Sequence, residues 1–321
     1  MNKLQKYLST CLLATAALLV GTVPAWAQTA PNLGTASDFS ILGGTAVTDT
    51  GSTITGNVGS ADAVSLTNSA INGNLVHTGV FTNVTSTISG TITQPLNPQV
   101  ITDLNSAWTA VQSIPCTATL TATITGPVTL APGVYCTDGA LTGAGVLTLD
   151  GGGDTNAVWI FKIGAALTGT GFSVVMANGA QPCNVFWVPG ADVTMTSSAF
   201  SGNILAGSTA AAGGSITLNY GTLAGRALAN TAVSMTGVNV IGCAALPGAP
   251  TSCKPEKKHG HDKDHGRDKN KDHKKCNQGV GNGPEDCDPG KSDHGATWPF
   301  NSNDEHDGDK PGHPGRQGSK H

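Results

Sequence analysis

Apolar and small polar residues alternate along much of this chain, in short runs that glycine, asparagine and aspartate interrupt. A period of two predicts β-strands, and the interrupting residues predict turns between them. Three late runs nearly repeat one another: VTMT from Val193, ITLN from Ile216 and VSMT from Val233, at steps of 23 and 17 residues. Imperfect repeats of this length are typical of stacked solenoid coils.

Side chains alternate between the two sides of a strand, so the repeats also predict which residues point outward. Val193 and Met195 are expected to point into the coil, and their neighbours out of it. The same alternation places six residues outward: Thr194, Thr196, Thr217, Asn219, Ser234 and Thr236. Stacked coils bring such residues into rows about 4.8 Å apart between strands and about 6.7 Å apart along a strand. The repeat therefore predicts a flat array of hydroxyl and methyl groups.

One segment departs from this pattern, and its spacing predicts a helix over residues 98–113. Apolar residues recur there at helical intervals: Val100, Leu104, Trp108 and Val111. Asn97 is expected to cap this helix, with Pro98 at its first position. We expect the helix to pack against the side of the coil through Leu104 and Trp108.

The N-terminal 27 residues have the features of a secretory signal peptide. Lys3 and Lys6 precede an apolar run, and Ala25-Trp26-Ala27 forms a small-x-small cleavage site. No later stretch is apolar enough over sufficient length to cross a bilayer. We therefore expect an exported, soluble protein without a membrane span.

Charge is distributed unevenly along the chain. Residues 28–253 contain two cations, Lys162 and Arg226, and eight acidic residues, whereas residues 254–321 contain thirteen of each sign and eight histidines. Neither part has a basic excess, which argues against a nucleic-acid partner. An almost uncharged body and a densely charged tail predict two parts with different physical behaviour.

The composition predicts four regions: a signal peptide (1–27), a β-solenoid (28–245), a Pro-rich and then Lys/Asp/His-rich linker (246–275), and a short Cys/Gly/Asp cassette (276–321). The last two cannot bury a core and are expected to be largely disordered. His259 and His261 are weak candidates for a transition metal, and Asp286 and Asp288 for Ca²⁺. The favoured interpretation is a solvated spacer without metal, and attachment to a cell surface or matrix would suit such a tail.

Seven cysteines remain after the signal peptide. Disulfides persist in exported proteins, and we expect pairs between Cys116 and Cys136, Cys183 and Cys243, and Cys276 and Cys287. Sequence alone does not fix this connectivity. An odd number leaves one thiol free or paired between molecules.

The body offers little for catalysis. Asp150 and Asp154 flank a GGG turn, His77 is the only histidine of the body, and Lys162 and Arg226 are isolated. Glycan cleavage needs paired carboxylates, or acids on a metal with a nearby base, and no such spacing is present. We expect a protein that is not an enzyme and needs no cofactor.

Several stretches together resemble the secreted ice-binding proteins of the discontinuous β-solenoid type. They are NLGTASDFSILGGTAVTDTGSTITGNVGS, LAPGVYC, AVWIFKIG, NVFWVPG, SGNILAG, SITLNYGTLAGRALA and AVSMTGVNVIGC, together with the single helix. The resemblance runs from about Leu33 to Cys243. It implies a mainly β protein: a right-handed, three-faced solenoid with one helix alongside, in which the N-terminal coils insert beside coils made later in the chain.

In that family a flat face, often rich in threonine, binds ice. The resemblance carries this face onto the six outward residues of the closing strands, with Thr53 and Thr55 as additional candidates whose register is open; Thr85, Thr87 and Thr142 are others. It implies an extracellular protein, expected to be a monomer, that adsorbs to ice and inhibits its growth or recrystallisation. The alternative is a non-catalytic adhesin or matrix solenoid that binds polysaccharide or protein.

Overall fold

The computed structural model describes residues 28–207 and 214–246. Several predictions concern residues outside these ranges: the signal peptide, the charged linker, the C-terminal cassette, the Cys276–Cys287 pair and the metal candidates. All described residues belong to one compact unit.

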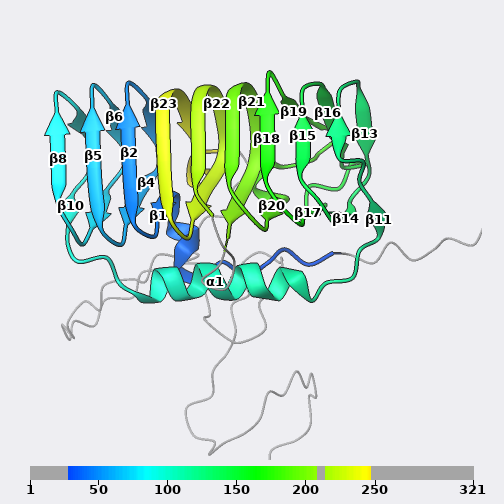
Figure 1. The fold of residues 1–321 in the computed structure, drawn as a ribbon, viewed down its shortest axis with the longest axis horizontal. Helices are drawn as coiled ribbons and strands as arrows, with labels where there is room; N and C mark the ends of the chain where they lie inside the picture. Colours follow the sequence, from blue (N-terminus) through cyan, green and yellow to red (C-terminus); the bar gives the residue numbers. More distant parts are fainter. Residues whose placement is uncertain (1–27, 208–213, 247–321) are drawn as a thin grey trace, which may run out of the picture. The chain divides into compact units, whose positions relative to one another are not determined.

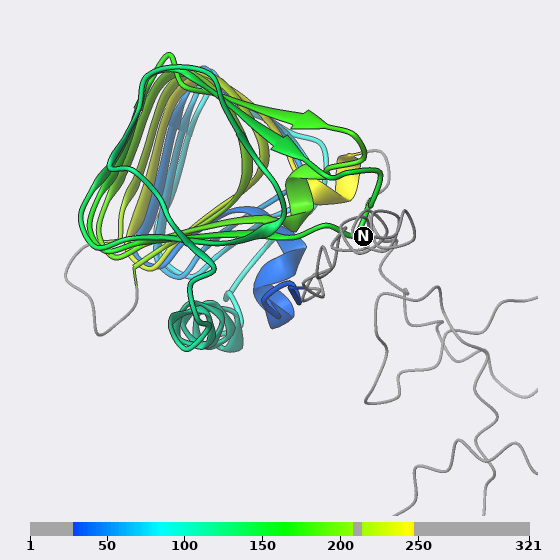
Figure 2. The same ribbon diagram turned by 90° about the vertical axis from the view of Figure 1, so that its right-hand side faces the viewer.

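The described chain forms a triangular prism of stacked parallel strands (Figures 1 and 2). Its 23 strands belong to one continuous sheet, which winds around an interior core. One α-helix, α1 (Gln99–Gln112), runs along the outside of one face. The three-faced β-solenoid predicted from the sequence is confirmed.

Each face is a stack of parallel strands. The front face of Figure 1 contains β8 (Phe81–Val84), β5 (Ala63–Thr67), β2 (Ala46–Thr50), the first parts of β23 (Ala232–Ile241), β22 (Ile216–Ala229) and β21 (Val193–Ala206), then β18 (Leu167–Thr170), β15 (Leu141–Gly143) and β12 (Thr123–Ile124). We call this stack the front face.

The helix-covered face contains β10 (Ile92–Thr93), β7 (Leu75–His77), β4 (Asn57–Ser60), β1 (Phe39–Gly43), the last parts of β22 and β21, β20 (Val185–Pro189), β17 (Trp159–Ile163), β14 (Gly133–Thr137) and β11 (Ala118–Thr119). The third face contains β9 (Thr87–Ile88), β6 (Ala70–Asn72), β3 (Thr53–Thr55), the later parts of β23, β22 and β21, β19 (Ser173–Ala177), β16 (Val146–Asp150) and β13 (Val128–Leu130). Short 3₁₀ helices are η2 (Gly34–Asp38), η3 (Pro182–Asn184) and η4 (Cys243–Ala245).

The order of the coils in space is not their order in the chain. The last strands, β22 and β23, pair with the first, β1, β2 and β3, so the N-terminal coils continue the stack beside the C-terminal ones. Strands β10 and β11 are consecutive in sequence but lie at opposite ends of the prism (Figure 1). They are the outermost of ten stacked strands, so about 43 Å separates them. Helix α1, about 21 Å long, and its extended flanks carry the chain back between the two ends.

A helix was predicted over 98–113, and the structure has it over Gln99–Gln112. The helix begins one residue later than predicted, so Pro98 and not Asn97 is its N-cap. The Asn97 side-chain oxygen still accepts a hydrogen bond from the Gln99 N–H at 3.0 Å. Leu104 is fully buried, and the Trp108 indole N–H donates to the Pro189 carbonyl at 3.1 Å. The predicted apolar side of the helix therefore packs on the helix-covered face.

This packing explains why two strands of that face lack alternation. The sequences WIFKI of β17 and VFWVP of β20 are buried or nearly so along their whole length, because one side points into the prism and the other toward α1. Phe161 and Trp187 stack inside the prism with ring centroids 4.0 Å apart. Ile160 and Phe186 belong to the outer layer beneath the helix.

Both disulfides expected within the described residues are present. Cys116 bonds to Cys136 beside the last coil, and Cys183 bonds to Cys243 across 60 residues of sequence.

One buried position conflicts with its surroundings. Asp49 of β2 points into the prism, where its strand neighbours in register are Met235 and Leu66. The side chain is 1% exposed, and within the described residues no hydrogen-bond partner is in place for either carboxylate oxygen. Burial raises the pKa of the Asp49 carboxyl above its ordinary value, and the nearby Ser52 and Ser69 hydroxyls offset only part of this effect.

We predict that Asp49→Asn stabilises the protein near neutral pH and leaves it little changed in acid. The folded state binds the Asp49 proton more tightly than the unfolded state, so the stability of the wild-type protein falls as the pH rises through the raised pKa. Asparagine carries no charge at any pH. Its expected gain at pH 7 is about 1–3 kcal/mol, measured by denaturant unfolding between pH 4 and 8.

The matched control is Asp62→Asn, which removes an exposed carboxylate from the neighbouring coil. Its unfolding free energy is expected to follow the wild-type curve. A wild-type stability that is identical to that of Asp49→Asn at every pH would contradict the prediction.

Candidate functional site

The outward residues of the front face form two straight columns. Strand register aligns nine residues in the first column: Thr123, Thr142, Thr168, Thr194, Thr217, Ser234, Thr48, Ser65 and Thr82. The second column has seven: Thr170, Thr196, Asn219, Thr236, Thr50, Thr67 and Val84. Every member of the first column carries a hydroxyl group. We call this surface the Thr array.

The columns are straight because seven coils turn at the same point. In each, the residue after the second column has a positive φ of 49–70°: Gly51, Asn68, Thr85, Gly171, Ser197, Tyr220 and Gly237. This left-handed residue bends the chain from the front face into the third face. A common bend keeps each column member directly beside its counterpart in the next coil.

The structure places the six predicted residues of the closing strands on one face, and their role in binding stays a prediction. Thr194, Thr217 and Ser234 lie in the first column. Thr196, Asn219 and Thr236 lie in the second. Thr142, one of the additional candidates, also belongs to the first column.

Thr53 and Thr55 do not belong to this array. Both lie on β3 in the third face, in register with Asn239 and Ile241. The left-handed Gly51 separates them from Thr48 and Thr50 and turns the chain around the corner. Thr87 lies on the third face as well, and Thr85 occupies a corner position.

The sequence interpretation missed more than half of the array. Nine of its sixteen members were missed: Thr48, Thr50, Ser65, Thr67, Thr82, Val84, Thr123, Thr168 and Thr170. A signal for most of them was present, since AVTDTG from Ala46, AVSLTN from Ala63 and ALTGTG from Ala166 align with AVSMTG from Ala232. Each places a glycine or asparagine directly after the second column.

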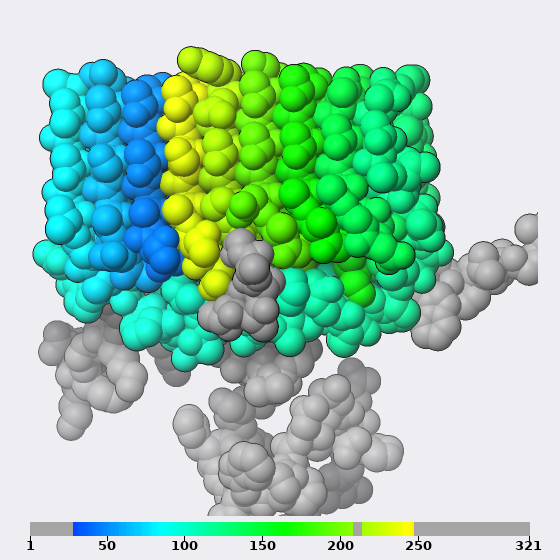
Figure 3. Space-filling view, in the orientation of Figure 1, coloured from blue at the N-terminus to red at the C-terminus, as the bar shows by residue number. Residues whose placement is uncertain are grey.

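The array is open and uncharged. Within the described residues, none of the Thr and Ser side chains in the two columns hydrogen-bonds to another protein group, so their hydroxyls are free for water. Asp192 directly precedes β21 at the border of the array. Its carboxylate accepts hydrogen bonds from the Ser215 N–H and hydroxyl and the Gly214 N–H. These bonds, chiefly those from Ser215, hold the pKa of Asp192 below its usual range and retain its charge at the edge. Figure 3 shows the front face as a broad surface on which successive coils form side-by-side bands.

The third face is different in chemistry, although it has the same strand spacing. Its outward residues include Val146, Ser173, Ala199, Thr222 and Asn239 in successive registered positions. Valine, alanine and isoleucine interrupt the hydroxyls there. A full column of hydroxyl residues is therefore a property of the front face and not of the fold as such.

Strand β22 contains the main irregularity of the array. Asn219 lies between Thr196 and Thr236 in the second column. Tyr220 follows it at the corner, with φ of 60° and a side chain that is 60% exposed. The ring lies over Gly237 of the next coil, where an added Cβ would be 2.9 Å from it. Both side chains are longer than threonine, and they lie at the edge where the front face meets the third face.

The acidic residues considered for catalysis stabilise turns. Asp150 accepts hydrogen bonds from the Gly152 N–H and the Asn178 side chain, which lower the pKa of its carboxyl. Asp154 accepts from the Asn156 N–H. His77 is buried beside Phe81, and its Nδ1 lies 2.9 Å from the Gly79 carbonyl oxygen. No group of three or more potential metal ligands occurs within residues 28–207 and 214–246.

A stack of parallel coils with one flat, uncharged, threonine-rich face defines a β-solenoid whose surface is suited to ordering water. Residues 41–241 match the family described as Ice-binding-like, and this chain belongs to that family. Relatives and solved structures agree with this assignment.

An ice-binding protein of Nostoc sp. (strain HG1) is 39% identical over 209 residues, covering 63% of this chain and 71% of that protein. Ice-binding protein K3-B1 of Typhula ishikariensis is 31% identical over 210 residues, covering 62% and 86%. The crystal structure of an ice-binding protein from the Antarctic ascomycete Antarctomyces psychrotrophicus superposes with a TM-score of 0.56 at 29% identity, covering 68% of this chain and all of that one, 100%.

Proposed function

We propose that this protein adsorbs to ice through the Thr array and thereby inhibits ice growth or recrystallisation. The observation that carries the proposal is the pair of straight outward columns, nine and seven residues deep, on one uncharged face. The names of the relatives, which are ice-binding proteins, support the same function.

The array supplies the two properties that an ice-ordering surface needs. Threonine methyl groups restrict the neighbouring water, while hydroxyl groups anchor it through hydrogen bonds. The rows repeat at about 4.8 Å and about 6.7 Å, close to repeat distances of ice planes. Water held in this pattern can join the crystal lattice without large rearrangement.

Rigidity is the second requirement. Threonine is β-branched and stiff at χ1, so few rotamers are lost when the face meets a crystal. Except at the two ends of the stack, the strands beneath are fixed on both sides by backbone hydrogen bonds, and they pack on an apolar interior. Lysine or glutamate in the columns would add many rotamers and strongly hydrated charge, and neither residue occurs there.

The proposed setting is outside the cell. Two disulfides, Cys116–Cys136 and Cys183–Cys243, suit an oxidising compartment, and residues 1–27 have the pattern of an export signal. Within the described residues, no helix is long and apolar enough to cross a bilayer. The function requires neither a cofactor nor a catalytic group, since adsorption changes no covalent bond.

We predict that Thr194→Tyr and Thr217→Tyr each abolish most of the thermal hysteresis and the inhibition of recrystallisation. Each places a bulky ring at the centre of the first column, which lifts the flat face off the crystal. Both side chains are at the surface, so the free energy of unfolding is expected to change by no more than about 0.5 kcal/mol. The measurements are thermal hysteresis and ice recrystallisation on the whole chain without residues 1–27.

The control is Thr53→Tyr, which adds the same ring to the third face. It is expected to retain wild-type activity on ice. Loss of activity in this variant, with activity kept in the other two, would move the binding surface to the third face. A folded wild-type protein without any effect on ice would refute the proposed function and favour adhesion.

We also predict that Asn219→Thr increases thermal hysteresis. The substitution completes the threonines of the second column between Thr196 and Thr236 and replaces a flexible amide with a stiff side chain. The matched control, Asn239→Thr, makes the same change on the third face and is expected to have no effect. Equal gains in both variants would argue against a role for the second column.

A further inference from the structure

The Thr array crosses a junction between two parts of the chain. Strand β23 meets β2 there, and the array continues from Ser234 to Thr48 and from Thr236 to Thr50, residues that are 186 apart in sequence. The coils of β1–β10 are connected covalently to the C-terminal coils only through the segment that contains α1. We call the pairings of β22 with β1 and of β23 with β2 and β3 the seam.

Arg226 is one of two cations between residues 28 and 253, and it bridges the seam. It lies on β22, and its Nε and Nη2 donate hydrogen bonds to the Ser37 carbonyl oxygen at 3.1 and 3.0 Å. Ser37 belongs to η2, directly before β1 and 189 residues from Arg226. A single side chain thus joins the C-terminal coils to the start of the N-terminal ones.

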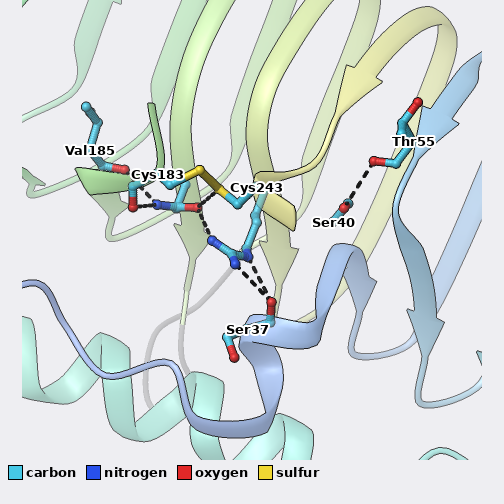
Figure 4. The surroundings of a disulfide bond; sticks show 8 residues. Ser37, Ser40, Thr55, Cys183, Val185 and Cys243 are labelled. Atoms are coloured by element: carbon cyan, nitrogen blue, oxygen red, sulfur yellow. Dashed lines mark hydrogen bonds between the residues drawn. A yellow bond between two sulfur atoms is a disulfide. The ribbon is translucent and has the colours of Figure 1, made fainter. Parts of the chain in front are cut away.

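The other end of the guanidinium is held by the C-terminal coils. Its Nη1 donates to the Asn203 side-chain oxygen at 2.9 Å, in the adjacent strand β21. The Asn203 amide in turn donates to the Cys183 and Val185 carbonyls at 2.8 and 3.1 Å. Figure 4 shows this network beneath the Cys183–Cys243 disulfide, with Ser37 on the opposite side.

Burial of the Arg226 guanidinium favours one fixed set of hydrogen bonds. Burial lowers the pKa of Arg226 to about 10, and the nearby Asp38 offsets part of that shift. The group therefore remains charged at neutral pH. A charged guanidinium that has lost water needs its acceptors, and charge-assisted hydrogen bonds with a planar fork hold their partners in a fixed geometry.

The hydrogen-bond network of Arg226 lies where it can affect how the two sets of coils align on the front face. Arg226 follows Gly225 at the corner between the third and helix-covered faces, which is the corner opposite the Thr array. Figure 2 shows the short helices η3 and η4 at the same corner. The array is flat only if the N-terminal and C-terminal coils stack without a bend between them. A contact at the corner furthest from the array opposes such a bend most strongly.

We infer that Arg226 is a positioning residue for the Thr array: by binding Ser37 across the seam, it keeps the N-terminal and C-terminal halves of the front face coplanar. The inference rests on the proposed function for its effect on ice, but its structural part is independent of that function.

The test compares Arg226→Met with Lys162→Met in the whole chain without residues 1–27. Lys162 is the matched control, because its ammonium also donates to two carbonyls, those of Gln112 and Ile114, but away from the seam. Hydrogen exchange is followed by mass spectrometry in β2 and β23 at the seam and in β15 and β18 away from it. Thermal hysteresis is measured on the same samples.

For Arg226→Met we expect exchange about tenfold faster in β2 and β23 and unchanged in β15 and β18. Thermal hysteresis is expected to fall at least about twofold, because a bent array fits a crystal plane poorly. Lys162→Met should leave both the seam exchange and the activity as in the wild-type chain. Arg226→Lys retains the charge but not the planar, two-pronged guanidinium, so its exchange and its activity should lie between those of the wild type and Arg226→Met. It replaces Arg226→Met in the test if that variant does not fold.

Equal acceleration of exchange in all four strands would assign Arg226 a general stabilising role and overturn the inference. Unchanged exchange at the seam would overturn it as well, as would faster seam exchange with full activity on ice. A wild-type chain inactive on ice would refute the proposed function, while the exchange pattern would still decide whether Arg226 holds the seam.

Discussion

The structure depends on in-register parallel stacking, in which each side chain lies directly beside its counterpart in the next coil. This constraint turns a local alternation of apolar and hydroxyl residues into an apolar interior on one side and long columns on the other. It also makes errors costly, since a shift by one residue would place Val193 and its counterparts outside and bury threonines. The common left-handed corner after the second column, from Gly51 to Gly237, applies the same bend to successive coils and keeps the columns straight.

Stacking also explains the exceptions. Asp49 occupies an interior position that Met235 and Leu66 fill in adjacent coils, yet it lies between two members of the Thr array. The backbone alternation that orients Thr48 and Thr50 outward leaves no other direction for it. The fold accepts a buried carboxyl because neighbouring coils supply enough apolar contact to hold the strand in place.

The sequence predicted the features that depend on neighbouring residues, and the family resemblance supplied the overall architecture. Alternation identified the strands, helical spacing identified α1, and the repeat of the closing strands placed Thr194, Thr217 and Ser234 on one face. It did not separate Thr53 and Thr55 from Thr48 and Thr50, because the separating event is a single left-handed Gly51 and similar T-x-T patterns flank it on both sides. Nor did it give the role of Arg226, since no pattern near that residue points to Ser37, 189 positions earlier.

The seam also determines when the front face comes into existence. The first coils have a free edge at β1, β2 and β3 until β22 and β23 arrive, and these are the last strands of the solenoid to leave the ribosome or cross a membrane. The last strands to be added therefore lie in the middle of the stack and not at its end. A chain interrupted before residue 216 would lack both β22 and β23. It would have two unfinished stacks, each with an open strand edge, and an array divided at the place where it should be continuous.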